Sequence, residues 1–472
     1  MHISGRPLKG NPSELLSKGE RDYMERYTKR IRKAPHSSKE TSHCVRRWFE
    51  GINRKLAYRL FRRFFHNDDL TTLLDPSQVR SIFVIPFGAA IGDMVVALPL
   101  FHAIKQHLPH CKVGTFVTER NHSLVRSDPN VDEVFSVRDK RSFRNFREIR
   151  RARRSGYDVV INMHIHGMTK YGLIANAISP RGTKVSWGHA RGKLYRTLYN
   201  ELLPYDRDSM HAAQMGLLML ESVIALDRPL EQRESRPTII VRDTTRALVE
   251  ERIRATLDQL GASWYVHLNI QARNPRMEWG IENIVALARR FLTQYPDGAI
   301  FFSASPIMRD IVQQQISTQS LHRIAFFPTS FDLQELAVLV QNSRLVITPD
   351  TAVTHFASAS SRPVLVLHPG LIGLPLEWIP LQVPSYILAP PSRSMAAADI
   401  LPEDAWQAVK SLLSGERKAT ATSLGLKPEA DPLFQASNAS EPLASLILRS
   451  SVPQIIREFT PTLLADAALR TT

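Results

Sequence analysis

Cysteine is almost absent from this sequence, because Cys44 and Cys111 are the only two in 472 residues, and they lie in unrelated contexts. This scarcity excludes a disulfide framework and a cysteine-built zinc site, and it is typical of a reducing compartment. Runs of about 18 apolar residues, which a membrane-spanning helix needs, are absent too. Residues 1–20 lack the apolar segment of a secretory signal. The sequence therefore predicts a cytoplasmic protein.

Acidic residues are in the minority, and 61 Lys and Arg against 45 Asp and Glu give a net charge of +16. Two stretches carry this excess: residues 1–80 hold 18 basic and 9 acidic residues, and residues 138–154 hold 9 and 2. A local excess of positive charge points to an anionic partner, such as a membrane, an acidic substrate or nucleic acid. Nucleic acid is the weakest of these, because Phe143 and Phe146 are the sole aromatic residues in the second stretch and no nucleic-acid-binding module is recognisable.

Residues 45–66 combine an apolar stripe, which contains Trp48, Phe49, Leu56 and Leu60, with many Arg and Lys residues. This spacing predicts a basic amphipathic helix. Such a helix is typical of membrane interfaces, and it can equally pack on the body of a protein. The pattern leaves both alternatives open.

Short apolar runs alternate with helical patterns from residue 80 onward, which predicts parallel strands joined by crossover helices. The Pro- and charge-rich segment 227–237 interrupts this alternation, which then restarts. We therefore expect two doubly wound α/β domains at 80–226 and 238–415, joined by that linker. A basic extension at 1–79 and a tail at 416–472 flank them.

The individual elements follow from the same pattern. The expected strands are 81–87, 112–118, 131–137, 157–163, 184–189, 238–241, 265–272, 299–305, 324–329, 344–350 and, as the final one, 363–370. The expected helices are 93–107, 121–127, 138–154, 170–177, 206–226, 244–260, 280–294, 307–315, 333–341, 351–359 and 402–413.

The loop after the first strand, from Gly88 to Asp93, has the composition of a ligand site. Gly88 and Gly92 allow a ligand or another backbone to approach closely. Asp93 begins the next helix, where it can cap the helix or act as a general base towards a hydroxyl group. A carboxylate near a helix N-terminus stays ionised, as a base must, and one residue can fill both roles.

A second candidate loop, Asp350–His355, joins a strand to a helix. The first N–H groups of that helix, with the hydroxyls of Thr351 and Thr354, predict a site for a diphosphate. Asp350 is expected to accept hydrogen bonds from sugar hydroxyls, whereas His355 either reaches a phosphate oxygen or is satisfied within the fold.

Two arginines, Arg273 and Arg276, follow the first strong strand of the second half. They can clamp phosphates with paired hydrogen bonds, or they can lie in solvent on a loop.

Three segments, in this order, resemble glycosyltransferase family 9, the lipopolysaccharide heptosyltransferases. They are IPFGAAIGDMVVALPLFHAIKQHLP at 85–109, NPRMEWGIENIVALARRF at 274–291 and SRLVITPDTAVTHFASASSRPVLVLHPG at 343–370. The resemblance covers about residues 80–415. It implies a GT-B fold, in which two Rossmann-like domains hold the active site in the cleft between them. It also implies an inverting enzyme that transfers heptose from ADP-heptose without a metal or another cofactor.

The resemblance assigns roles by position. Asp93 matches the proposed general base, with Gly88 and Gly92 in the acceptor-side loop. The donor-side positions are Asp350, Thr351, Ala352, Val353, Thr354 and His355, together with Arg273 and Arg276. This sequence departs from the family pattern at Ala352, where the family has Gly, and at Met277, where it has Lys. Other departures are Ala90-Ile91 in the first loop and His368-Pro369-Gly370 at the last strand. These changes bear on the donor more than on the fold.

The expected protein is thus a transferase, peripherally associated with the inner membrane, that acts on an anionic glycolipid of the lipopolysaccharide core type. No metal-ligand cluster is visible in the sequence. The alternatives are the same fold with another nucleotide-sugar in a different surface-glycan pathway, a non-catalytic relative, or a basic protein that binds nucleic acid.

Overall fold

The structure is a computed structural model, and it describes most of the chain between residues 63 and 415. The described residues are 63, 65, 67–138, 143–164, 169–188, 193–204, 210–272, 274–304, 306–317, 319, 321–327, 332–369, 376–390 and 395–415. Arg273, the tail at 416–472 and nearly all of the expected amphipathic helix at 45–66 lie outside them.

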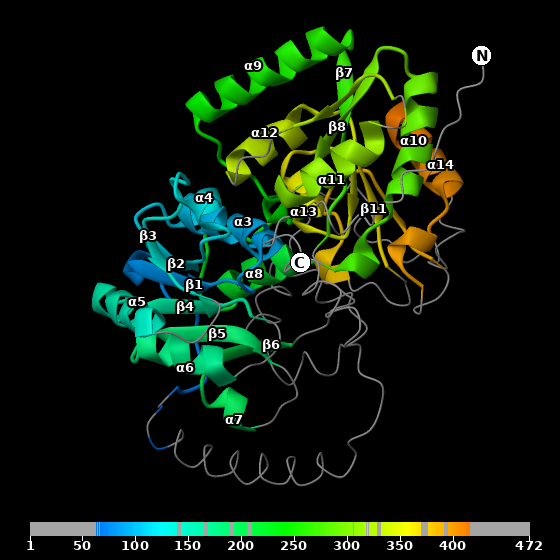
Figure 1. The fold of residues 1–472 in the computed structure, drawn as a ribbon. Helices are drawn as coiled ribbons and strands as arrows, with labels where there is room; N and C mark the ends of the chain where they lie inside the picture. The colour runs from blue at the N-terminus through cyan, green and yellow to red at the C-terminus, as the bar shows by residue number, and fades with distance from the viewer. Residues whose placement is uncertain are drawn as a thin grey trace, which may run out of the picture. The chain divides into compact units, whose positions relative to one another are not determined.

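The first domain is built on a sheet of six parallel strands in the order β3-β2-β1-β4-β5-β6 (Figure 1). The strands are β1 (Ser81–Ile85), β2 (Lys112–Val117), β3 (Glu133–Ser136), β4 (Val159–Asn162), β5 (Thr183–Gly188) and β6 (Glu201–Pro204). Every residue of β1 is buried. A central parallel strand has helices on both faces, so its sequence is apolar throughout rather than alternating.

Helices cover both faces of this first sheet. The helices α3 (Ile91–His107) and α8 (Ala212–Glu221) cover one face, and α5 (Phe143–Ser155) and α6 (Thr169–Ile178) cover the other. Alternate residues of β1 show the division: Ile82 and Val84 belong to the cluster of α3 and α8, and Phe83 and Ile85 to that of α5 and α6. Short helices α4 (His122–Val125) and α7 (Lys193–Arg196) complete the domain.

The second sheet has the order β12-β11-β10-β7-β8-β9, again all parallel. Its strands are β7 (Trp264–Asn269), β8 (Gly298–Ser303), β9 (Ile324–Phe326), β10 (Val346–Pro349), β11 (Val364–Leu367) and β12 (Ser385–Leu388). Its helices are α9 (Asp243–Leu260), α10 (Ile281–Gln294), α11 (Pro306–Ser317), α12 (Leu333–Asn342), α13 (Ala352–Ala359) and α14 (Pro402–Ser414). Five 3-10 turns join these elements: η2 (Pro76–Gln78), η3 (Gln232–Ser235), η4 (Pro275–Met277), η5 (Leu376–Trp378) and η6 (Ala397–Asp399).

Both sheets follow one winding scheme. In each, the first strand of the domain lies at the centre, with its second and third strands to one side and its fourth to sixth to the other. The winding direction therefore reverses beside β1 in the first domain and beside β7 in the second. Ligands of doubly wound sheets bind at such reversal points, beyond the carboxyl ends of the strands. The loops that follow β1 and β10 lie there.

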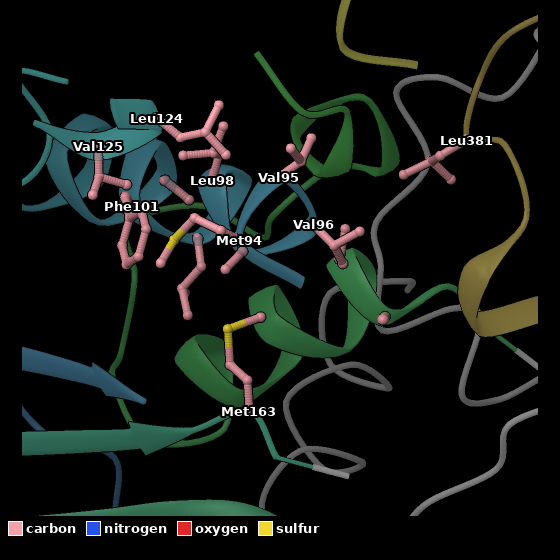
Figure 2. Packing of buried hydrophobic residues seen from close by; sticks show 14 of the residues in the cluster. Met94, Val95, Val96, Leu98, Phe101, Leu124, Val125, Met163 and Leu381 are labelled. Carbon is pink, nitrogen blue, oxygen red and sulfur yellow. The ribbon is translucent and has the colours of Figure 1, made fainter. Parts of the chain in front are cut away.

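The two domains share a buried apolar layer. One hydrophobic cluster includes side chains of α3, α8, α12 and α13, and Figure 2 shows Val96 of α3 and Leu381 of the second domain within it. The segment expected as a linker, 227–237, also packs on this layer, because His107 of α3 contacts Glu234 of η3 at 2.9 Å. Continuous burial of this kind fixes the ends of α3 and α13 relative to each other.

The sequence-based elements need four corrections. Residues 238–241 form no strand, since β9 and β12 are the edges of the described second sheet, and a strand needs a partner. The strand at 363–370 is not the last one, because β12 follows it. Helix 206–226 is shorter and is observed as Ala212–Glu221. The strand β6 was not predicted. Like β12 it is an edge strand of four residues, and proline is the last residue of β6 and directly precedes β12, so neither gives much periodic signal.

Within the described residues, no helix combines the length and the apolar character that crossing a membrane requires.

Candidate active site

The loop between β1 and α3 positions Asp93 on the first turn of α3. The Asp93 carboxylate accepts a hydrogen bond from the backbone N–H of Ala90 at 3.2 Å, so Ala90 is the N-cap of α3 and Asp93, at the third helical position, satisfies its N–H. A Cβ atom on Gly88 would lie 2.4 Å from Asp93 Oδ2. Only glycine leaves room there for the carboxylate, which explains why a small residue stands at this position.

The loop between β10 and α13 is tied down by a network of hydroxyl and amide groups. Thr351 is the N-cap of α13, and its Oγ1 accepts from the N–H of Val353 at 3.2 Å. Asn269, the last residue of β7, donates to Thr348 Oγ1 at 3.0 Å and to Thr351 Oγ1 at 3.2 Å. One buried amide thus connects the ends of β7 and β10 and holds the first turn of α13 in place.

Polar groups on that first turn of α13 remain without partners. The backbone N–H of Ala352 forms no hydrogen bond among the described residues, as expected for the first residue of a helix. The hydroxyl of Thr354 is buried, and within the described part of the chain it has no partner either. Unsatisfied donors at the positive end of a helix favour an anionic ligand. The side chain of Val353, by contrast, is buried in the apolar layer.

Asp350 and His368 end two neighbouring strands and face each other. The distance between Asp350 Oδ2 and His368 Nε2 is 3.5 Å. Burial raises the pKa of Asp350, and the charge of His368 works against this rise. Burial lowers the pKa of His368, while Asp350 works in the opposite direction. A carboxylate and an imidazole at the carboxyl edge of the sheet can bind hydroxyl groups of a sugar as acceptor and donor.

The two candidate loops meet where α3 and α13 touch. A Cβ atom on Gly92 would lie 2.9 Å from Cδ2 of His355 and 3.5 Å from the Cα atom of Ala352. Glycine at 92 therefore allows the first turns of the two helices into backbone contact. Asp93, the next residue, lies in the first turn of α3 at the same junction. The structure thus brings a carboxylate from the first domain and the N-terminus of α13 from the second to one place.

Buried aromatic rings support this junction from behind. The ring of His355 lies 6.2 Å from the ring of His211, the N-cap of α8, and 6.1 Å from that of Trp378. Trp378 in turn packs edge-on against Phe87 at 5.3 Å. Burial lowers the pKa of His355 to about 4. Burial first, and then the neighbouring His355, lower the pKa of His211 to about 3. Both imidazoles are therefore neutral at neutral pH.

Arg276 and Trp279 form an anchor near the second domain's carboxyl edge. Arg276 donates to the carbonyl of Met395 at 3.0 Å, and the indole N–H of Trp279 donates to the carbonyl of Ile400 at 2.9 Å. Trp279 is buried. This pairing holds η4 against η6, so the guanidinium of Arg276 has a structural partner in addition to any ligand.

Two residues of the site escaped the sequence reasoning. Asn269 connects the strand ends, and His211 supports His355 from α8. The sequence contained a feature that could have identified each of these two residues. Asn269 is a polar residue at the end of an apolar strand, and His211 with Gln214 has capping-box spacing, which the structure confirms. Among the described residues, no cluster of three or more His, Cys, Asp or Glu has the arrangement of a metal site.

Comparison with known proteins finds a glycosyltransferase family domain within this chain. Residues 146–369 match the family description "Glycosyltransferase family 9 (heptosyltransferase)". Lipopolysaccharide heptosyltransferase 1 of Campylobacter coli is 19% identical over 287 residues, which cover 59% of this chain and 81% of that protein.

Solved structures of the family share the fold. The glycosyltransferase family 9 protein of Veillonella parvula superposes with a TM-score of 0.59 at 20% identity, covering 73% of this chain and all of that one. The ADP-heptose lipopolysaccharide heptosyltransferase II of Escherichia coli gives 0.54 at 17% identity, covering 71% and 99%. The fold is GT-B, as two tandem sheets of this topology indicate. The chain is therefore a glycosyltransferase that carries a family 9, heptosyltransferase-type domain.

Proposed function

We propose that this protein is an inverting, metal-independent heptosyltransferase that transfers heptose from ADP-heptose to a glycolipid acceptor of the lipopolysaccharide core type. One observation carries the proposal. The first turns of α3 and α13 are in contact, so the carboxylate of Asp93 and the free N–H end of α13 lie at one junction. A base for the acceptor and a cradle for the leaving diphosphate are the two parts that a single displacement requires.

The reaction is one substitution at the anomeric carbon. Asp93 takes the proton from an acceptor hydroxyl while the hydroxyl oxygen forms its bond to the anomeric carbon of the heptose. The bond from that carbon to the diphosphate oxygen breaks on the opposite face, so the configuration inverts. ADP leaves with the electron pair, and the positive end of α13 stabilises the charge that grows on its diphosphate.

The donor contacts follow from the position of each residue. The N–H of Ala352 and the hydroxyl of Thr354 bind the diphosphate, and Thr351 and Val353 shape the turn that presents them. Asp350 binds heptose hydroxyls. Arg276, held by the carbonyl of Met395, lies on the phosphate side, and we give Arg273, which is outside the described residues, the same role from its position in the sequence. His355 acts through the junction, because its neutral ring packs on Gly92 and fixes α13 against α3.

The proposal places the protein in the cytoplasm at the inner face of the inner membrane. The nucleotide-sugar donor is water-soluble, and the acceptor is anchored in the lipid. A net charge of +16 favours an anionic surface of this kind.

Nucleotide binding tests the donor. Thermal and urea unfolding of the full chain should be measured with ADP, UDP and GDP, before and after EDTA. ADP at 100 times its Kd is expected to raise the free energy of unfolding by about 2.7 kcal/mol, with no change on adding EDTA. A preference for UDP or GDP would keep the fold and replace the donor. A shift that EDTA abolishes would contradict metal-independent binding.

Substitution at Gly88 tests whether the position of Asp93 matters. Gly88→Ala puts a methyl group at the place now taken by Asp93 Oδ2, so the carboxylate must move. A displacement of about 1 Å at a reacting group costs on the order of 100-fold in rate, so kcat for heptose transfer is expected to fall by that factor. ADP binding should not change. Gly156→Ala is the control. An added Cβ at Gly156 meets no atom, but the residue has φ +67°, so this variant shows the effect of backbone strain without displacement of the base. Equal kcat values for Gly88→Ala and wild type would argue against the role of Asp93.

A further inference from the structure

The outer face of α5 combines positive charge with an exposed aromatic ring. Phe146 is 66% exposed, and it is one of three large apolar side chains exposed in the described residues, with Leu248 and Leu401. Arg147, Arg150, Arg153 and Arg154 are exposed on the same helix. Positions three, four, seven and eight residues apart share a face of a helix. Phe146 therefore shares a face with Arg150, Arg153 and Arg154, and Arg147 borders it because it is three and seven residues from Arg150 and Arg154. We call this surface the arginine face.

Among the described residues, no acidic side chain neutralises the arginine face. Glu148, the one acidic residue of α5, pairs with Arg151 at 2.9 Å. Arg151 also donates to the carbonyl of Val134 and covers the ring of Phe135, so its charge is paired and held by the domain although the side chain is exposed. The four arginines of the arginine face form no ion pair with any described residue. Unpaired cations around an exposed aromatic ring call for an anionic partner that also accepts apolar groups.

The arginine face continues into a cavity at the C-terminal end of α5. This cavity of about 710 Å³ lies at the amino ends of β1, β4 and β5, and Arg153 and Arg181 line it. Its carboxylates, Asp75 and Asp158, accept hydrogen bonds from nearby backbone N–H groups. Asp75 and Asp158 offset Arg153 and Arg181 in this cavity, so the net positive charge is confined to the outer face of α5.

The topology connects this surface with the active site. The helix α5 starts after the carboxyl end of β3 and returns to the amino end of β4. Phe146 stands in its first turn, towards the edge of the sheet where the loop with Asp93 lies. A flat surface in contact with the length of α5 therefore extends to the carboxyl edge of the first sheet, where the loop with Asp93 lies and where an acceptor must enter.

We propose that the arginine face docks this protein on an anionic lipid bilayer, with Phe146 entering the interface and the four arginines contacting lipid phosphates. This inference rests on the proposed function, since a transferase with a lipid-anchored acceptor works at such a surface. A bilayer fits better than nucleic acid, because a lone exposed Phe beside arginines inserts among acyl chains, whereas base stacking uses aromatic residues in series.

Vesicle sedimentation of the full chain tests the docking surface. The variants are Phe146→Ala and Arg147→Gln/Arg150→Gln, each compared with wild type on vesicles of phosphatidylglycerol and phosphatidylcholine. Each arginine near an anionic membrane contributes about 1 kcal/mol, so the double variant is expected to bind on the order of 25-fold more weakly. Phe146→Ala is expected to lose on the order of five-fold, since it removes a ring that is only partly exposed.

Matched controls carry the same changes elsewhere. Leu248→Ala removes an exposed apolar residue from α9, and Arg236→Gln/Arg254→Gln removes two exposed arginines outside α5. Both controls are expected to bind vesicles as wild type does. Thermal unfolding checks that all variants are folded. Equal binding by the α5 variants and their controls would overturn the proposal, as would binding to a duplex oligonucleotide in preference to the anionic vesicles.

A second readout separates docking from catalysis. With a delipidated, water-soluble acceptor, the α5 variants should transfer sugar at the wild-type rate. With the acceptor embedded in vesicles, they should show a raised KM. Loss of transfer with both acceptors would place α5 in the active site and overturn docking as its role. Should the protein transfer no heptose at all, the vesicle measurement still decides the docking surface by itself.

Discussion

Asp93→Asn is expected to lower kcat for heptose transfer by on the order of 1,000-fold while leaving ADP binding unchanged. A positioned general base contributes about 100- to 10,000-fold, and an amide cannot take a proton from a hydroxyl. The amide oxygen of Asn still accepts the hydrogen bond from Ala90, so the first turn of α3 is preserved. The rate of ADP release at steady state gives kcat, and the shift in unfolding temperature on adding ADP reports ADP binding.

Asp399→Asn is the matched control for that experiment. Asp399 caps η6 by accepting from the N–H of Ala396, three residues earlier, as Asp93 does with Ala90. The same isosteric change at 399 removes a charge from a capping carboxylate away from the junction, and its kcat is expected to be that of wild type. If Asp93→Asn kept more than about a tenth of the wild-type kcat, the base would have to be sought elsewhere.

The free energy of unfolding is expected to fall by roughly 3 kcal/mol per pH unit between pH 6.5 and 4.5. His211, His267 and His355 are buried, and burial lowers their pKa values to about 3, about 3 and about 4. As the pH falls below 6.5, the unfolded chain takes up protons on these histidines and the folded protein does not. Each contributes about 1.4 kcal/mol per pH unit, so acid favours unfolding.

One group acts in the opposite direction in the same window. Burial raises the pKa of Glu201 to about 7, so the folded protein holds a proton there that the unfolded chain releases, and this stabilises the fold as the pH falls. Asp350 and His368 contribute two shifts of opposite sign. With three histidines and one glutamate, the unfolded chain binds about two more protons than the folded protein in this pH range. At about 1.4 kcal/mol per proton and pH unit, this difference gives the slope of roughly 3 kcal/mol per pH unit.

His211→Asn isolates the contribution of one histidine. Asn can still accept from the N–H of Ala213, as Nδ1 of His211 does, so the start of α8 is kept. Urea unfolding at several pH values should then give a slope smaller by about 1.4 kcal/mol per pH unit. An unchanged slope would mean that His211 takes up a proton in the folded protein near pH 6.

The sequence by itself determined the two-domain α/β architecture and the positions of the two candidate loops. Periodicity did this for long elements such as α3 and α9, because the interior of a doubly wound sheet demands continuous apolar strands and amphipathic helices. It failed at β6 and β12 and at residues 238–241. Edge strands are short, and whether an apolar run becomes a strand depends on a free sheet edge, which no local pattern records.

The tertiary structure alone decided that the loops after β1 and β10 meet. Gly92 and His355 lie 263 positions apart, and only the shared apolar layer between the domains brings them into contact. The same holds for Asn269, whose amide joins two strands, and for the exposure of Phe146 on α5. Residue types and spacing specify which chemistry is present, whereas contacts between distant segments depend on how whole layers pack, and this decides which of those groups can act together.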